Sequence, residues 1–371
     1  MFWVVLIVVL CAMGYVLWHV WCILPFPKWG KWLATVLMAA CVLSMFPLLG
    51  GLLERLRLNW ASLFYDVSTS SIIIMLYLLM IFLVLDLSRL VHLLPSGFLH
   101  ESWKGTLAIL VLMLVLFVGG HIHYNNKVRV PLQLTTDKAI GRDYKMVMVS
   151  DLHLGYHNRR QELARWVDLI NAEHADFILV AGDIIDISTR PLVEEEMAKE
   201  FRRLNAPVYA CLGNHEYYSN EPKARRFYQE AGIHLLIDGK TVLDSVITVV
   251  GRDDRTNRDR KALEALTADV DPSTFSIVLD HQPYNLQDVE RCGVDFQFSG
   301  HTHRGQVWPI SWITDAIYEC SHGSHQIGST RFYVSSGLGI WGGKFRIGTQ
   351  SEYVVATLHT NDNADSPHSQ E

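Results

Sequence analysis

Four long apolar stretches fill the first third of the chain, and they limit what it can fold into more than any other feature. They cover residues 1–24, 32–53, 68–85 and 105–124. Each has close to the roughly 20 residues with which a helix crosses a bilayer. A buried helix of a soluble core could explain one such run, but four in succession favour the membrane. We therefore expect residues 1–124 to form an all-α, four-helix transmembrane domain.

The charged flanks of these stretches bear on orientation, because Lys and Arg favour the cytoplasmic side of a membrane. With the N-terminus inside, the inner flanks hold five such residues and the outer flanks four. They are Arg55, Arg57, Lys127, Arg129 and Lys138 inside, and Lys28, Lys31, Arg89 and Lys104 outside. A cleaved signal peptide fits poorly, since no positive segment precedes the first stretch. We expect a multi-pass protein of the cell membrane with a cytoplasmic C-terminal part.

The composition argues against several classes of protein. A net charge of -6 gives no basic footprint for nucleic acid. The six cysteines include no CxxC spacing, which disfavours zinc ribbons and thioredoxin-like chemistry. Three of them, Cys11, Cys22 and Cys41, lie in predicted membrane segments, so a disulfide framework is not expected. The sequence leaves the oligomeric state open.

The rest of the chain has the alternation of an α/β domain. Residues 125–143 are polar and predict a linker that carries one strand at 128–134. From residue 144 to 359, strand-like runs alternate with helical patterns, such as 193–204, which indicates a sandwich of mixed sheet flanked by helices. Residues 360–371 are polar and predict a disordered tail.

Four short motifs of metal-binding residue types follow one another along this domain. They are Asp151-Leu152-His153, Gly182-Asp183-Ile184-Ile185-Asp186, Gly213-Asn214-His215-Glu216 and Gly300-His301-Thr302-His303. Each ends an apolar, strand-like run, where the sites of α/β folds usually form. The runs are 146–150, 177–181, 208–212 and 296–299. One Asp at a strand end is often only a helix cap, but four ordered blocks with unlike ligands are improbable as independent caps.

These residue types suit a pair of divalent cations. Asp, His and Asn are hard and borderline ligands, and the lack of Cys among them favours Mn, Fe or catalytic Zn over structural zinc. Two cations about 3.5 to 4 Å apart can neutralise a phosphoryl group and generate hydroxide. The pattern therefore favours a hydrolase of phosphate esters.

With these motifs, the sequence resembles the calcineurin-like metallophosphoesterase superfamily over about residues 145–358. It resembles most the bacterial membrane-associated branch, whose last motif runs Ser-Gly-His-Thr-His-x-Gly-Gln, here Ser299–Gln306, followed by Gly-Leu-Gly, here Gly337–Gly339. The resemblance implies two mixed β-sheets flanked by helices. It also implies two divalent ions, Mn, Fe or Zn with Mn favoured, and attack on phosphorus by a hydroxide that bridges them.

The resemblance also assigns roles by position. It implies that Asp151, His153 and His303 bind the first metal, that Asn214, His281 and His301 bind the second, and that Asp183 bridges them. His215 would face the phosphoryl group and stabilise charge or protonate the leaving oxygen. Asp186 would orient ligands from behind the bridging Asp183.

The lone histidine of the family pattern is the assignment least fixed by a motif. His281 is chosen because residues 276–279 are strand-like and Asp280-His281-Gln282-Pro283 occupies the place of a His-x-Pro turn. His174 and His234 lie in predicted helix-to-strand connections and are expected to be surface residues.

Three further features admit two interpretations each. Arg304 stands where close relatives have Gly, and it would either bind a second phosphate of the substrate or point into solvent. The loop 252–260 mixes Arg and Asp, which is typical of a solvated face or, less often, of phosphate recognition. The apolar segment 308–318 is either core or a contact for a lipid tail.

The sequence thus predicts a membrane-anchored, two-metal phosphoesterase acting on a phosphodiester or pyrophosphate, with a lipid-linked substrate and membrane lipids as partners. A phosphodiesterase for soluble small phosphodiesters is the alternative. A metal-binding scaffold and an accessory of a membrane transporter are the alternatives from other classes, the latter suggested by His19, His92, His121 and His123 near predicted membrane ends.

Overall fold

The computed structural model describes residues 2–361, so most of the predicted tail, from residue 362 on, lies outside the described residues. Contacts divide the chain into two compact units. The first comprises Met1–Ile122 with Gly342–Lys344, and the second His123–Trp341 with Phe345–Glu371.

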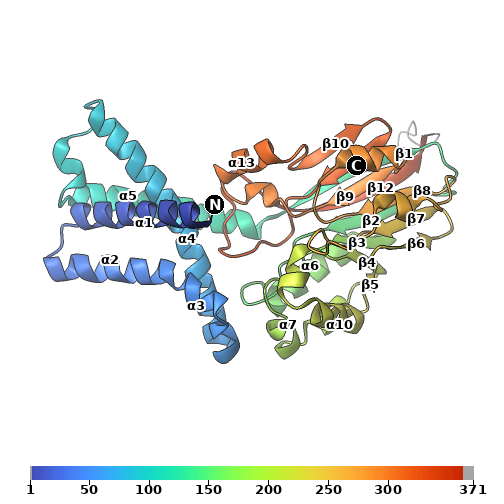
Figure 1. Cartoon of the computed structure of the whole chain (residues 1–371), viewed down its shortest axis with the longest axis horizontal. Helices are drawn as coiled ribbons and strands as arrows, with labels where there is room; N and C mark the ends of the chain where they lie inside the picture. Colours follow the sequence, from blue (N-terminus) through green and yellow to red (C-terminus); the bar gives the residue numbers. More distant parts are fainter. Residues whose placement is uncertain (1, 362–371) are drawn as a thin grey trace. The chain divides into compact units, whose positions relative to one another are not determined.

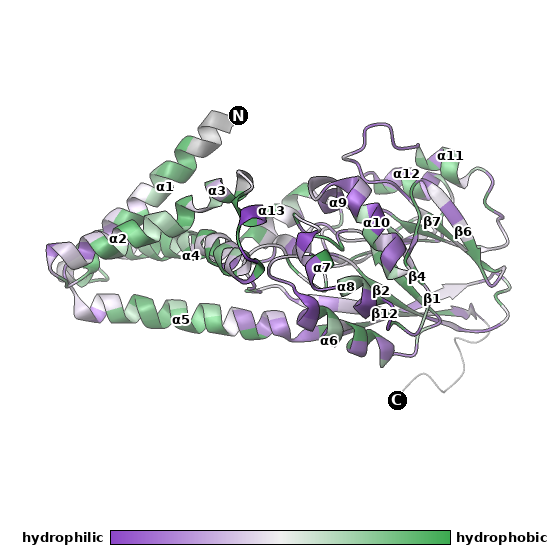
Figure 2. Ribbon diagram, turned by 90° about the horizontal axis from the view of Figure 1, so that it is seen from below, coloured by the Kyte–Doolittle hydropathy of each residue, from purple (hydrophilic) through white to green (hydrophobic). Residues whose placement is uncertain are grey.

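The first unit is helical and apolar, as the green ribbons of Figure 2 show. Its elements are α1 (Phe2–Ile23), α2 (Lys28–Leu43), α3 (Met45–Leu49), η1 (Leu52–Arg55), α4 (Leu58–Leu90), η2 (Ser96–Leu99) and α5 (Trp103–Asn125). Three segments are long and apolar enough to cross a membrane, Lys28–Leu48, Leu58–Leu90 and Trp103–Asn125, and Ile7–Ile23 is a shorter apolar helix. The second predicted stretch, 32–53, is divided between α2 and α3 because Pro47 has no N–H to continue the helical hydrogen bonds.

A partly buried polar cluster joins α1 to α4 inside this unit. Nε2 of His19 lies 2.9 Å from Oδ2 of Asp86, and the Tyr15 hydroxyl donates to the same oxygen at 2.7 Å. The His19 ring also stacks on Phe82 with 4.7 Å between centroids. His19 is therefore engaged in packing two helices together and is not an isolated metal ligand near a membrane end.

The second unit is built on two six-stranded sheets (Figure 1). The first has the order β1 (Lys127–Thr136), β12 (Ser351–Thr360), β2 (Tyr144–Val149), β3 (Phe177–Ala181), β4 (Val208–Cys211) and β5 (His234–Leu235). The second has the order β10 (Gly323–Ile327), β11 (Thr330–Val334), β9 (Phe296–Ser299), β8 (Phe275–Leu279), β7 (Ile247–Gly251) and β6 (Gly239–Leu243). Both contain parallel and antiparallel pairs, so the two mixed sheets that the resemblance implied are confirmed.

The core of this unit lies between and outside the sheets. One apolar cluster unites the facing sides of the two sheets, with Met146 and Leu179 from the first and Val249 and Ile277 from the second. The outer faces are covered by helices with buried stripes. They are α6 (Arg160–Asn171), α8 (Met197–Phe201) and α10 (Glu221–Ala231) on one side, and α11 (Leu263–Thr267) and α12 (Leu286–Arg291) on the other. Because both faces of β3 are covered, every one of its residues is buried.

Two segments differ from the expectation. The predicted helix over 193–204 is two short helices, α7 (Arg190–Glu194) and α8, because Glu196 between them has a left-handed φ of 52° that no α-helix accommodates. The segment 125–143, expected as a linker with one strand, contains the ten-residue β1, which pairs in parallel with β12 along its whole length. It is therefore part of the sheet as well as a connection.

Candidate metal centre

Five strand ends bring the predicted ligands to one edge of the sandwich. Asp151 follows β2, Asp183 follows β3, Asn214 follows β4, His281 follows β8, and His301 and His303 follow β9. In the first sheet β2, β3 and β4 run parallel to one another, and in the second sheet β8 and β9 do, so their carboxyl ends lie together. The sheet order thus converges motifs that are up to 150 residues apart in the chain.

The backbone at this edge is unusual. Left-handed φ angles of 45° to 71° occur at five of the predicted ligands, Asp151, His153, Asp183, His301 and His303. Each such residue costs on the order of 1–3 kcal/mol, and such residues cluster at functional sites. Five of the residues that converge here thus have a backbone conformation that a regular strand does not have.

The first group of converging ligands consists of Asp151, His153 and His303. Nε2 of His153 lies 3.0 Å from Nε2 of His303. Oδ1 of Asp151 is 3.4 Å from the His303 nitrogen and 3.8 Å from the His153 nitrogen. All three side chains are buried. Three possible metal-ligand atoms, one from each side chain, therefore lie around a common point.

The second group consists of Asp183, Asn214, His281 and His301. Oδ1 of Asn214 lies 2.9 Å from Nδ1 of His301 and 3.1 Å from Nε2 of His281. The same His281 nitrogen is 3.1 Å from Oδ2 of Asp183. Nδ1 of His281 donates to the Ala181 carbonyl oxygen at 2.8 Å, which leaves the Nε2 lone pair for a metal.

Asp183, a member of the second group, also lies close to the first group. Its Oδ2 is 3.1 Å from the His281 nitrogen and 3.7 Å from Nε2 of His153. Burial raises the pKa of Asp183, but His281 and His215 outweigh burial and hold that pKa well below its usual range. These contacts thus favour the carboxylate form of Asp183, which is the form that binds metal ions.

The charges of the first group fit a cation. Burial lowers the pKa of His153, but the nearby carboxylates Asp151 and Asp186 outweigh burial and raise this pKa to about 10. Burial lowers the pKa of His303 well below its usual range. Two imidazole nitrogens 3.0 Å apart cannot both carry protons, so at least one of them offers a lone pair that a metal ion could accept. The donor set fits two divalent ions. The assignment of individual ligands remains a prediction.

Asp186 and His215 form a layer next to these ligands. Oδ1 of Asp186 lies 3.5 Å from Nδ1 of His153 and 3.2 Å from Nδ1 of His215. The His215 ring is 4.5 Å from the His153 ring and retains 14% side-chain exposure. Asp186 therefore lies behind His153, not behind Asp183 as expected, and His215 lies at the accessible side. The roles of both residues stay predictions.

Glu216 has a role that the sequence did not reveal. It is fully buried, and it accepts backbone N–H bonds from Gly213 at 2.7 Å, Asp183 at 3.1 Å and Ile185 at 3.0 Å. These bonds tie the second motif to the third. The position of Glu216 directly after His215 in the third motif was the available signal in the sequence. Its partners Asp183 and Ile185 follow another strand, β3, and the sequence does not show that contact.

Arg346 is a second residue that the sequence analysis missed. Its buried guanidinium donates to the carbonyl oxygens of His303, at 2.7 Å, and of Ser336 and Gly339. Burial lowers the pKa of Arg346 to about 10. The side chain anchors a metal-binding turn to the Gly-Leu-Gly segment, and no motif in the sequence marked it.

The arginines of loop 252–260 divide into two kinds. Arg252 and Arg260 pair with the buried Asp280, at 2.8 and 3.3 Å, and so fix the loop beside His281. Arg255 is exposed, and its guanidinium lies 4.2 Å from the centre of the Tyr284 ring.

A tyrosine pair continues from Arg255 towards the metal ligands. The Tyr284 and Tyr318 hydroxyls are 3.0 Å apart, and the Tyr318 ring is 6.3 Å from the His301 ring. Arg304, the other candidate cation, is half-buried, and no ion pair of its side chain occurs within residues 2–361. Within residues 2–361, Arg255 and Arg304 are thus two cations of this region whose side chains form no ion pair with a carboxylate.

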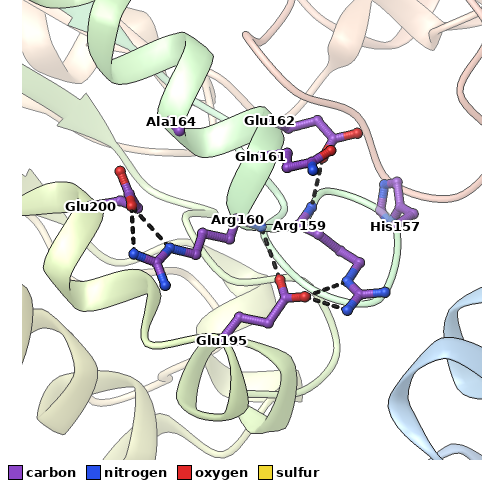
Figure 3. Close-up of a pocket in the computed structure, with 8 residues that line it drawn as sticks. All are labelled: His157, Arg159, Arg160, Gln161, Glu162, Ala164, Glu195 and Glu200. Atoms are coloured by element: carbon purple, nitrogen blue, oxygen red, sulfur yellow. Dashed lines mark hydrogen bonds and ion pairs between the residues drawn. The ribbon is translucent and has the colours of Figure 1, made fainter.

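A cavity of about 670 Å³ beside α6 does not offer a further anion site (Figure 3). Its Arg159 is paired with Glu195 at 2.7 Å, and its Arg160 with Glu200 at 2.9 Å. His157 also lines this cavity, and its Nδ1 lies 3.7 Å from Oδ2 of Asp186. This contact links the cavity to the residues next to the metal ligands. Carboxylates neutralise both cations, so the cavity has little attraction for phosphate.

A two-sheet α/β sandwich with paired His, Asp and Asn clusters at its strand ends defines a class of dinuclear metalloproteins. The family described as Calcineurin-like phosphoesterase matches residues 144–305. An uncharacterized metallophosphoesterase of Bacillus subtilis is 30% identical over 59% of this chain and 80% of that protein. The chain belongs to the calcineurin-like phosphoesterase family.

Two other relatives differ in what they share with the chain. An uncharacterized metallophosphoesterase of Campylobacter jejuni is 30% identical over 63% of this chain and 65% of that protein, so less than two thirds of it is covered. A transmembrane protein with metallophosphoesterase domain of Danio rerio is 26% identical over 81% of this chain and 74% of that protein. The second match extends beyond the second unit, which carries the candidate metal centre and is called the catalytic unit below.

Proposed function

We propose that the chain is a membrane-anchored phosphoesterase that hydrolyses a phosphodiester or pyrophosphate bond with two divalent metal ions. The convergence of two ligand clusters on Asp183 carries this proposal, because a shared carboxylate keeps two cations close together. Two such ions neutralise a phosphoryl group and activate water when bound. Manganese is the first metal to test, followed by iron and zinc, since N and O ligands accept all three.

The chain's own residues would divide the remaining tasks. Asp151, His153 and His303 would hold one ion, and Asn214, His281 and His301 the other. Asp186 lies against Nδ1 of His215 and so fixes the orientation of that ring. The other ring nitrogen of His215 is then free to face a phosphoryl oxygen, where it stabilises charge or gives a proton to the leaving oxygen. Arg304 would bind a second anionic group of the substrate.

A lipid-linked phosphoester is the substrate class we propose, and a soluble small phosphodiester is the second candidate. Three apolar helices of membrane-spanning length and a transmembrane relative support the membrane setting. An enzyme held at a bilayer meets lipid-linked substrates at high local concentration. We propose further that the protein is a multi-pass protein of the cell membrane with its catalytic unit in the cytoplasm.

The test combines metal analysis with a substrate panel for three variants. Asp183→Asn removes the shared charge and is expected to lose metal and activity together. His215→Ala is expected to keep the metal and lose most turnover, by roughly 10²-fold or more. His174→Ala changes an exposed histidine away from the clusters and should behave as wild type. Full activity of Asp183→Asn would refute the bridging role, and metal binding without turnover on any phosphoester would favour a scaffold.

A further inference from the structure

Helix α13 (Ile310–Ile317) exposes apolar side chains that a surface helix usually buries, next to the exposed Asp315. Ser311 is buried, whereas Trp312, Ile313 and Ile317 are 65%, 57% and 60% exposed. A surface helix ordinarily buries its apolar side chains and exposes its polar ones. Trp308, which precedes the helix and is 40% exposed, packs its ring against that of Trp312 at 5.3 Å. We call these four exposed apolar residues the α13 face.

The helix is held in this orientation by contacts to the metal-binding turn. A side-chain atom on Gly305 would come within 2.5 Å of the Ile310 and Ser311 backbone, so the helix lies directly on the turn that carries His303. Thr302 of the same turn donates to the Ser321 carbonyl oxygen just beyond the helix at 2.6 Å. The exposed side chains are thus a fixed feature of the surface and not the product of a loose segment.

A bilayer is the partner that matches this face. The apolar helix α5 ends at Asn125 and β1 begins at Lys127, so a single residue joins a helix of membrane-spanning length to the unit that carries α13. Tryptophan is enriched where proteins meet the membrane–water boundary. A helix with Trp and Ile on one side is suited to lie in that boundary with its apolar face among the acyl chains.

We propose that the α13 face inserts into the headgroup and acyl boundary of the membrane and brings the metal centre to the lipid surface. Residues 308–319 contain no Lys or Arg. Insertion therefore depends on apolar contact and should persist at high salt and on uncharged lipid, unlike docking through a basic patch. The inserted face would thereby give amphiphilic phosphoesters access to the metal centre. This consequence rests on the proposed phosphoesterase function, whereas the insertion itself does not.

Insertion is tested on the full chain reconstituted in phosphatidylcholine vesicles. Ile313→Cys receives an environment-sensitive fluorophore, and Val242→Cys, which is 54% exposed on β6, is the matched control. Signal from native cysteines is measured on the unmodified chain and subtracted. The label at position 313 should shift to the blue and be quenched by acyl-chain spin-labelled lipid in 0.1 and 1 M salt, and the label at position 242 should not. Equal quenching at both positions, or none at 313, would overturn the proposal.

Two further measurements distinguish membrane insertion from an error in the proposed chemistry and from formation of a dimer. The same quenching is expected with Asp183→Asn, so an error in the proposed chemistry would leave this result intact. A disulfide between two copies through Ile313→Cys, without lipid quenching, would assign the face to a dimer and overturn the membrane role.

The consequence for activity is tested last. Trp312→Ser should slow hydrolysis of an acylated fluorogenic phosphodiester in vesicles at least fivefold and leave hydrolysis of bis(4-nitrophenyl) phosphate unchanged. Val242→Ser should change neither rate. Equal losses by Trp312→Ser on both substrates would show a structural defect and overturn the claim of lipid access.

Discussion

At the scale of single residues, the metal centre depends on how closely backbone segments approach one another. Gly337, in the Gly-Leu-Gly segment, has a φ of 89°, and a Cβ there would lie 2.9 Å from the Asp151 Cβ and 3.3 Å from Nδ1 of His303. The glycine therefore makes room for two ligands of the first group. The Gly-Leu-Gly motif was visible in the sequence. The need for glycine at position 337 was not, because it arises from contacts with distant segments of the chain.

Gly337→Ala is expected to lower metal affinity roughly tenfold or more, as displacement of groups that orient ligands commonly does. Gly232→Ala is the control, since Gly232 has a similar φ of 74° but nothing within 4 Å of an added Cβ. It should cost about 1–2 kcal/mol of stability from the left-handed backbone alone and leave metal content unchanged. Metal titration and thermal unfolding of both variants measure the two effects. Equal metal affinity in the two would remove the crowding argument.

Arg255 offers a test of how substrate is held beyond the metals. It stacks on Tyr284, which is linked through Tyr318 to the side of His301. Arg255→Ala should raise KM for a substrate with a second phosphate roughly tenfold, the size of one charged hydrogen bond at about 1.5 kcal/mol, with little change in kcat. Arg258→Ala removes an exposed charge from the same loop and should have no such effect. The same KM change in both variants would indicate a general loss of positive charge.

At the scale of elements, the sequence predicted individual strands better than it predicted which strands pair with one another. The apolar runs before each motif are strands β2, β3, β4 and β9, because continuous burial leaves a signature in runs of four to six residues. The pairing of β1 with β12 joins residues more than 220 positions apart, and no local pattern announces it. The break at Glu196 was missed for a related reason, since its left-handed backbone has no sequence signature comparable to Gly or Pro. The strand ends that carry the candidate ligands could therefore be predicted from the sequence, whereas the long-range pairing that surrounds them could not.

Glu352, on β12, holds the two sheets together and gives a pH prediction. It accepts hydrogen bonds from the Tyr333 hydroxyl of β11 at 3.1 Å and from the Ser336 N–H at 3.2 Å, and it pairs with His322 at 3.1 Å. Burial raises the pKa of Glu352, but His322 and Gln350 outweigh it and lower the pKa to about 2. The ordinary value is about 4.3. The folded form therefore favours the ionised carboxylate.

Because its pKa is depressed on folding, Glu352 contributes stability above about pH 4.3, and that stability is lost as the pH falls towards 2. A shift of this size corresponds to about 3 kcal/mol. The unfolding free energy of the wild type should exceed that of Glu352→Gln at pH 6, and the gap should narrow steadily between pH 5 and 3. Chemical unfolding of the catalytic unit, followed by tryptophan fluorescence, measures it. A gap that stays constant over this range would show that ionisation contributes nothing.

At the scale of the whole molecule, the number of membrane crossings decides which side of the membrane the catalytic unit faces. Three segments meet the length and apolarity of a span, and Ile7–Ile23 is a shorter apolar helix. Four crossings place the N-terminus and the catalytic unit on the same side, whereas three place them on opposite sides. The charge difference of one that favours a cytoplasmic catalytic unit is small, so the topology is better decided by accessibility than by sequence.

Labelling with a membrane-impermeant maleimide tests the proposed topology. Asp259→Cys, in an exposed loop of the catalytic unit, should react only after the cells are permeabilised. His100→Cys, exposed between α4 and α5, should react in intact cells, because that connection is expected outside. An N-terminal epitope tag should become accessible only together with position 259 if α1 crosses the membrane. Reaction of Asp259→Cys in intact cells would place the metal centre outside, and a tag exposed on the opposite side from position 259 would reduce the crossings to three.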